Sequence, residues 1–196
     1  ASVVQAATMQ GYAKLSGFTI SDTAAAVVGG LDGLVSASKL SSIGLTDGGT
    51  PSLSISYGQY MSDASVLAKI TGSYGLVVSG APASAGATLQ ADSRVTSFAV
   101  TGASVAQAST MQGYAKLSGF TISDAAAAVV GGLDGLVSAS KLSSIGLTDG
   151  GTPSLSISYA QYTSDASVLA KISGSYGLVV SGAPASADRK STRLNS

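Results

Sequence analysis

Aspartate is the residue type whose spacing in this chain comes nearest to a chemical site. The sequence has no Cys, His or Glu, so all ten acidic residues are Asp. Four of them end short runs in which apolar and small polar residues alternate, and stacking of those runs as strands would bring Asp22 and Asp47 together at one sheet edge. Carboxylates and loop carbonyls meeting there offer the oxygen ligands that calcium accepts. The calcium candidates are Asp22, Asp47, Asp124 and Asp149.

A second interpretation of the same aspartates needs no metal. In "SDTAAA" Asp22 stands where an N-cap precedes a helix, and in "TDGGTP" Asp47 starts a turn. Asp accepts hydrogen bonds from backbone N–H groups at both kinds of position. We prefer this capping interpretation and keep calcium as the alternative; beyond it the sequence predicts no cofactor.

Catalytic residue sets are nearly absent. Metal sites, triads and carboxylate pairs rely on His, Cys or Glu, which the chain lacks. "SASK" places Ser36 three residues before Lys39, and Ser138 repeats the spacing, which matches a serine nucleophile with a lysine base. The supporting Ser-Asp-Asn and Lys-Thr-Gly motifs do not occur, so we interpret "SASK" as a helix end. The sequence predicts no catalytic residue and no enzyme.

Tyrosines form the remaining candidate set, in two pairs three residues apart: Tyr57 with Tyr60, and Tyr159 with Tyr162. Aromatic rings stacked on an exposed face are suited to binding sugar rings or a protein partner. Packing in the core with a solvated hydroxyl is the interpretation that we prefer.

Charge and hydropathy exclude two classes of partner. Only a tenth of the residues are charged and the formal net charge is zero, which predicts no nucleic-acid binding, since phosphates require clustered Lys and Arg. No apolar run approaches the length of a membrane span, and the start carries no signal peptide. We therefore expect a fragment, or an export signal elsewhere. The absence of Cys fits an extracellular or a cytosolic protein.

The last nine residues, "DRKSTRLNS" at 188–196, differ from everything before them. They resemble the conceptual translation of a short-read sequencing adapter, so we interpret 188–196 as an artefactual tail of a metagenomic fragment.

The rest is a tandem repeat. Residues 1–85 align without a gap with 103–187, with six differences, so the domains expected are 1–102 as copy 1 and 103–187 as a truncated copy 2. Within each copy a shorter phrase recurs, as in "AKLSGFTISD", "SKLSSIGLTD" and "SRVTSFAVTG". Each phrase reads small residue, Lys or Arg, aliphatic, then a strand-like run. Such internal repetition is typical of solenoids.

Helical segments precede the phrases. We expect helices within 2–15, 21–40, 62–70 and 82–95, with Asp22 and Ser62 as N-caps and a capping box of Ser2 with Gln5. In the second of these helices Val27, Leu31, Leu34 and Val35 share the apolar side, and three glycines (Gly29, Gly30, Gly33) each cost about 1 kcal/mol relative to Ala. "PSLSIS" is an extra short strand. A helix followed by a strand is called a coil below.

Alternation in the strands predicts one packed face, with Phe18 and Ile20 inward and Thr19 outward. Helices connecting successive strands require parallel strands and right-handed crossovers. Helices are wider than the strand spacing, so the array must curve. The fold predicted is a curved right-handed α/β solenoid of helix–strand units, with a parallel sheet on one face and helices on the other.

"SDTAAAVVGGLDGLVSASKLSSIGLTDGGTPSLSIS" followed by "DASVLAKITGSYGLVVSG" resembles repeats of large secreted Gram-negative proteins, the haemolysin-type calcium-binding or adhesin-like repeat proteins. The resemblance covers nearly the whole chain apart from the tail. It implies type I secretion, an extracellular or cell-surface location, and a role in adhesion or biofilm matrix. The calcium nonapeptide Gly-Gly-x-Gly-x-Asp is absent, so the resemblance assigns calcium to no residue here.

Three functions remain open at this point. The first is a structural segment that displays other modules of a surface protein, partnered by neighbouring repeats. The second is a module that binds surface glycans or a protein through a concave polar sheet face or the Tyr pairs. The third is a spacer beside an enzyme domain elsewhere. Open strand edges at both ends predict that the isolated fragment self-associates.

Overall fold

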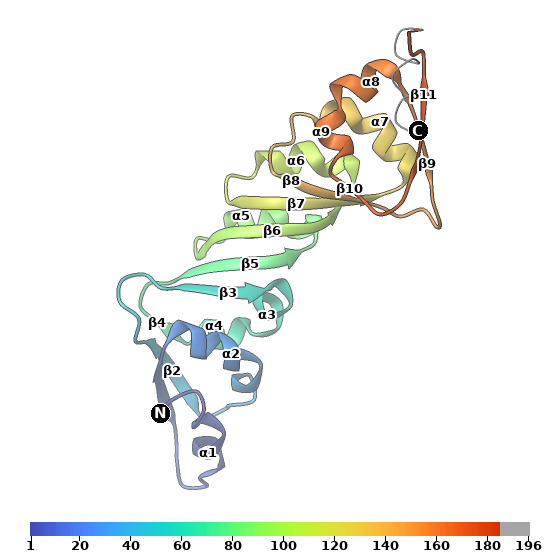
Figure 1. Ribbon diagram of the computed structural model, residues 1–196. Coiled ribbons are helices and arrows are strands. Elements are labelled where there is room, and N and C mark those ends of the chain that lie inside the picture. The colour runs from blue at the N-terminus through green and yellow to red at the C-terminus, as the bar shows by residue number, and fades with distance from the viewer. Residues whose placement is uncertain (185–196) are drawn as a thin grey trace, which may run out of the picture. The chain divides into compact units, whose positions relative to one another are not determined.

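A computed structural model describes residues 1–184, so the tail at 188–196 lies outside the described residues. The chain divides into two compact units. The first comprises Ala1–Ala81 and Ala87–Ala99, and the second comprises Pro82–Gly86 and the chain from Val100 onward. Figure 1 shows the same succession of strands and flanking helices in each unit. Each unit is described by itself.

The first unit alternates helices and strands. Its elements are α1 (Ala6–Gly11), β1 (Phe18–Asp22), α2 (Ala24–Leu34), β2 (Leu40–Leu45), β3 (Ser52–Ser56), α3 (Tyr57–Ser62), α4 (Ala64–Leu67), β4 (Ile70–Thr71), β5 (Gly75–Ala81), most of α5 (Gly86–Ala91) and the first part of β6 (Val95–Ala103). Strands β1, β2 and β4 form one parallel set, and β3 pairs in parallel with β5, which has β6 on its other side.

The second unit repeats this order. It contains a 3₁₀ turn at Ala83–Ala85, the end of β6, a second 3₁₀ turn at Val105–Gln107, α6 (Ala108–Gly113), β7 (Leu117–Asp124), α7 (Ala126–Leu136), β8 (Leu142–Leu147), β9 (Ser154–Ser158), α8 (Tyr159–Ser164), α9 (Ala166–Leu169), β10 (Ile172–Ser173) and β11 (Gly177–Ser181). Strands β7, β8 and β10 are parallel, as are β9 and β11. The predicted α/β class with mostly parallel strands is confirmed.

The extra run "PSLSIS" has a larger role than the sequence suggested. It forms β3, and β3 rather than β2 pairs along the length of β5. On the side away from β1, strand β2 pairs with the two residues of β4. Gly72, between β4 and β5, has φ +88°, a left-handed conformation that glycine adopts without strain. The third coil therefore divides its strand between two parallel sets, and Gly174 repeats the arrangement with φ +89°.

Two predicted N-caps are wrong. The cap of α2 is Thr23, whose Oγ1 accepts the Ala26 N–H at 3.2 Å, rather than Asp22. The helix expected within 62–70 is α4, and its N-cap position is held by Asp63 rather than Ser62. Ser62 instead ends α3, a helix that the sequence did not predict and that Ser56 caps by exchanging hydrogen bonds with Gln59. Thr23 and Ser56 are both hydroxyl residues on extended backbone, the geometry that lets an oxygen reach the first free N–H groups.

The core follows the predicted alternation. Phe18 and Ile20 are buried and Thr19 is exposed. On α2, the side chains of Val27, Leu31 and Leu34 are buried, whereas Val35 is half exposed because it falls at the end of the helix. The first predicted helix, 2–15, is shorter than expected and spans only Ala6–Gly11.

Candidate functional site

Each of the four calcium candidates accepts a hydrogen bond from a backbone N–H group near the start of its own coil. Asp22 Oδ2 accepts a hydrogen bond from the Val3 N–H at 2.9 Å, and its Oδ1 accepts the Thr23 N–H at 2.9 Å. Asp47 Oδ2 accepts the Ala24 N–H at 2.5 Å. The equivalent bonds of copy 2 run from Val105 and Ala125 to Asp124, and from Ala126 to Asp149.

The register of the strands explains this reach. Asp22 lies opposite Leu45 in the parallel pair of β1 and β2, so Asp47 stands two residues beyond it, past the end of β2. From there its carboxylate meets the first N–H of α2, the helix that precedes β2 in the same coil. Helix N-termini carry free N–H groups and partial positive charge, which favour a carboxylate. We call Asp22, Asp47, Asp124 and Asp149 the connector aspartates.

Lysines make the complementary bonds at the other end of the strands. Lys39 Nζ donates to Tyr12 O at 2.6 Å, and Lys69 Nζ donates to Leu40 O at 2.7 Å. Tyr12 is the C-cap of α1, where carbonyls lack helical partners and cations are favoured. In copy 2, Lys141 binds Tyr114 O and Lys171 binds Leu142 O. We call Lys39, Lys69, Lys141 and Lys171 the connector lysines.

Sequence reasoning missed the connector lysines, although the signal was present. Each phrase carries Lys or Arg directly before its first aliphatic residue. From the sequence, this residue is used to define the repeat but is assigned no hydrogen-bond partner. A glutamine adds to the same junction: Gln10 Oε1 accepts the Lys39 N–H at 3.0 Å and Gln10 Nε2 donates to Ser38 Oγ at 2.8 Å. Polar residues thus join one coil to the next at the start of the strands, whereas the aspartates join the end of each strand to its own coil.

Electrostatics agrees with the capping role. The N–H groups of Val3 and Thr23 lower the pKa of Asp22, since they stabilise its charged form. Among residues 1–184, no three potential metal ligands of the acidic, His or Cys types gather in one place. Calcium at the connector aspartates stays an untested prediction.

The "SASK" residues bond to separate groups. Ser36 Oγ donates to Gly33 O at 3.0 Å, and Lys39 Nζ donates to Tyr12 O. Ser138 repeats the first bond with Gly135 O at 3.0 Å. Both hydroxyls therefore bind carbonyls in the last turn of a helix, as the interpretation of a helix end predicts.

The tyrosine pairs do come together. The rings of Tyr57 and Tyr60 stack with centroids 6.1 Å apart, and those of Tyr159 and Tyr162 lie 6.4 Å apart. Tyr60 OH donates to Asp92 Oδ2 at 2.9 Å, and Asp92 also pairs with Arg94 at 3.0 Å.

Two effects compete at this network. Burial alone would raise the pKa of Asp92, but hydrogen bonds from Arg94 and Tyr60 outweigh it and lower the pKa. Burial, with the bond to the Asp92 carboxylate, raises the pKa of the Tyr60 hydroxyl. The equivalent Tyr162 is more exposed, and its hydroxyl has no hydrogen-bond partner in the described part of the chain.

Asp63 and Asp165, which the sequence did not single out, are the buried polar side chains of the described residues. One oxygen of Asp63 accepts from Ser62 Oγ at 2.7 Å, and Ser164 does the same for Asp165. The other oxygen of each is buried without a hydrogen-bond donor within residues 1–184. Contact with Asp165 raises the pKa of the exposed Asp134, because two carboxyl groups at close range favour a shared proton.

Comparison with known proteins gives no relative: no protein-family model, no curated protein and no solved structure matches the chain. In the part of the chain that the structure describes, no helix combines the length and apolar character that a membrane crossing needs.

Proposed function

We propose that the chain is a non-enzymatic structural segment that extends and displays other modules of a large secreted or cell-surface bacterial protein. The observation that carries the proposal is the use made of its recurring polar residues. The connector lysines bond to carbonyls of the preceding coil, the connector aspartates bond to backbone N–H groups at the start of their own coil, and both copies make the same bonds. Because the polar groups of these residues are occupied by bonds to the backbone, they fit a role in holding an extended repeat together better than a role in a chemical reaction.

The proposal includes the finer architecture. Repetition of the same junction along the chain supports a curved right-handed α/β solenoid in which each coil is stabilised by its neighbours. The natural partners of the segment are then the adjoining repeats of the parent protein. The extracellular or cell-surface location and the adhesin-like role rest on the repeat resemblance described above.

Insertion of further copies tests the extension. One or two additional copies of residues 1–102 are placed in frame after Gly102, and small-angle scattering measures the maximum dimension. Each copy supplies four rows of strands, so at about 4.8 Å per row we expect a gain of about 19 Å per copy. A maximum dimension that does not increase with copy number refutes the proposal.

One observation favours a second candidate, a glycan-binding module. Tyr162 is exposed beside Tyr159, and aromatic faces accept sugar rings. Binding on a glycan array that Tyr162→Ala abolishes, while Val137→Ala on the same unit leaves it unchanged, would establish this function. The absence of glycan binding leaves the structural proposal standing.

A further inference from the structure

Asp165 is a buried carboxyl group whose hydrogen bonds are incomplete. Its side chain is 2% exposed, and its Oδ1 accepts the Ser164 hydroxyl at 2.7 Å. No donor within residues 1–184 reaches its buried Oδ2, and Asp63 repeats the same arrangement with Ser62 in copy 1. An ionised carboxylate that is buried without donors is strongly unfavourable. The Asp165 Oδ2 therefore needs either a proton or a cation.

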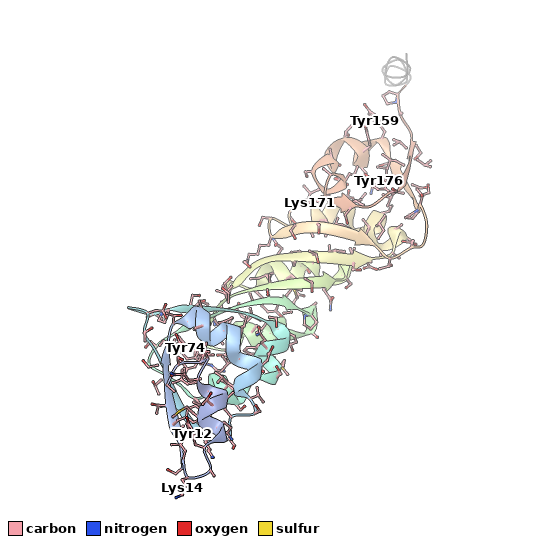
Figure 2. The ribbon with its side chains drawn as sticks, turned by 60° about the horizontal axis from the view of Figure 1, so that its bottom comes forward. Tyr12, Lys14, Tyr74, Tyr159, Lys171 and Tyr176 are labelled. Carbon is pink, nitrogen blue, oxygen red and sulfur yellow. The ribbon has the colours of Figure 1, made fainter. Side chains whose placement is uncertain are left out.

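The backbone of Asp165 joins two short helices. Asp165 follows the last residue of α8, a helix that begins at Tyr159 (Figure 2), and it precedes the first residue of α9. Its N–H donates to Gln161 O at 2.8 Å in α8. Its carbonyl accepts the N–H groups of Val168 and Leu169 at 2.9 and 3.0 Å, and both of these residues of α9 are buried. A displacement of Asp165 therefore disturbs both helices.

The ionisable group that meets Asp165 comes from a neighbouring helix. Helix α7 packs against α8, and Asp134 of α7 lies within hydrogen-bonding reach of the Asp165 carboxyl group and of the Gln161 side chain. Helix α8 also carries Tyr159 and Tyr162. Helix α9 and the strands β9 and β11, which pack against α8, have no ionisable side chain. The site is therefore a pair of carboxyl groups with no basic side chain on these elements.

A single proton completes this pair. Two ionised carboxylates only accept hydrogen bonds and repel each other, whereas a carboxylic acid also donates one. With one proton, Asp165 Oδ2 donates to Asp134 while Oδ1 still accepts from Ser164. Calcium takes about six to eight oxygen ligands, and within the described residues no three acidic side chains gather in one place. The available groups therefore fit a proton better than a metal ion.

We propose that Asp134 and Asp165 form a proton-dependent latch, in which one shared proton holds the junction of α8 and α9 against α7. Loss of that proton to water leaves two negative charges in contact, one of them buried, and loosens the junction. The latch goes beyond the proposed structural function, because it makes the packing of helices in copy 2 respond to pH.

The direction of the response follows from the carboxyl pair. The hydrogen bond with Asp165 and its charge raise the pKa of Asp134. The stabilisation is therefore fully present below the ordinary pKa of 3.8 and is lost as pH rises through the higher folded value. Asp22 acts in the opposite direction, since its folded pKa is lowered and its contribution is lost as pH falls.

Urea unfolding of the full chain between acidic and neutral pH tests the latch. Asp165→Asn keeps an oxygen for Ser164 and gives a permanent N–H donor for Asp134, so it imitates the protonated group. At neutral pH this variant should have a higher urea midpoint than the wild type, and the difference should vanish on acidification. Asp134→Asn should shift the midpoint in the same direction. The matched control is Asp22→Asn, which should lower the midpoint at neutral pH.

Hydrogen exchange locates the effect at the junction. The protection factors of the Val168 and Leu169 amides, which correct for the ordinary pH dependence of exchange, should fall in the wild type as pH rises. In Asp165→Asn they should stay constant.

Three outcomes overturn the proposal. The first is protection of these two amides in the wild type that does not change with pH. The second is a neutral-pH urea midpoint that neither Asp134→Asn nor Asp165→Asn raises. The third is a wild-type midpoint at neutral pH that calcium chloride raises while that of Asp165→Asn stays unchanged, because this result assigns the pair to a cation. None of these outcomes affects the length gain of covalent tandem copies, which tests the proposed function.

Discussion

The glycines of α2 offer the sharpest test of the packing between coils. A Cβ added at Gly30 would lie 2.3 Å from Val3 Cγ1, and at the equivalent Gly132 it would lie 2.2 Å from Val105 Cγ1. At Gly29 nothing stands within 4 Å. From the sequence, both glycines are expected only to weaken the helix. In the structure, Gly30 leaves the space that Val3 of the preceding coil occupies, whereas Gly29 faces open space.

Substituting alanine at the two pairs of glycines should change the free energy of unfolding differently. Gly to Ala in a helix interior gains about 1 kcal/mol, so Gly29→Ala with Gly131→Ala should stabilise the chain by about 2 kcal/mol. Gly30→Ala with Gly132→Ala gains the same propensity but must displace a valine methyl by more than an ångström, and overpacking costs about 1–3 kcal/mol per site. The second pair should therefore be neutral to destabilising by about 4 kcal/mol.

Urea unfolding followed by far-ultraviolet circular dichroism measures both pairs, since the chain has no Trp for fluorescence. Each substitution is made in both copies, so that the two copies are destabilised or stabilised equally. Adding Val3→Ala and Val105→Ala to the Gly30 pair should recover part of the loss, because the obstructing methyl is removed. Equal unfolding free energies for the Gly29 and Gly30 pairs would refute the close approach of the preceding coil.

The remaining predictions concern the caps, and urea midpoints measure all of them. Asp47→Ala with Asp149→Ala should each cost about 1 kcal/mol, since each removes the acceptor at a helix start. The pKa of Asp22 is lowered in the folded chain, so its contribution to stability is present above the ordinary pKa of 3.8 and is lost as pH falls through the lower folded value. Asp22→Asn should flatten that acid loss, and an unchanged pH profile would contradict it. Ala125→Thr should stabilise copy 2 by about 1 kcal/mol by restoring the cap that Thr23 gives copy 1, and no gain would argue against that cap.

Much of the fold follows from periodicity that acts locally. The alternation around Phe18 and Ile20 requires only that one face of a strand be buried, and the structure buries both. The predicted apolar side of α2 is confirmed at Val27 and Leu31 and wrong at Val35, because a helical pattern does not show at which residue the helix ends. The α/β class with parallel strands followed from the order of these elements.

What the sequence did not reveal depends on register between coils. Asp22 is predicted to cap the helix that follows it, but Thr23 holds that position and the Asp22 carboxylate reaches back to Val3, nineteen residues earlier. The partners of Lys39 and Lys69 lie twenty-seven and twenty-nine residues away, and spacing along the chain gives no indication of them. Likewise, β5 pairs with β3 rather than β2, and the chain between β4 and β5 passes through the left-handed Gly72, a conformation that residue propensities do not locate.

The differences between the two copies point to the same junctions. All six positions that differ are exposed in copy 1: Val4, Ala7, Thr23, Gly58, Met61 and Thr71. None is a connector aspartate or lysine, and none is a buried core residue. A side chain that bonds to the next coil must match a neighbour as well as its own backbone, so a change there disturbs two coils. Thr71 is the differing position that does bond to the preceding coil, through Oγ1 to Ile43 O at 3.1 Å, and its replacement Ser173 keeps the same bond to Ile145 O at 3.1 Å. The recurring phrase is therefore best understood as the surface by which one coil fits the next, with its Lys joining the start of the strand to the coil before it and its Asp joining the end of the strand to the start of its own coil.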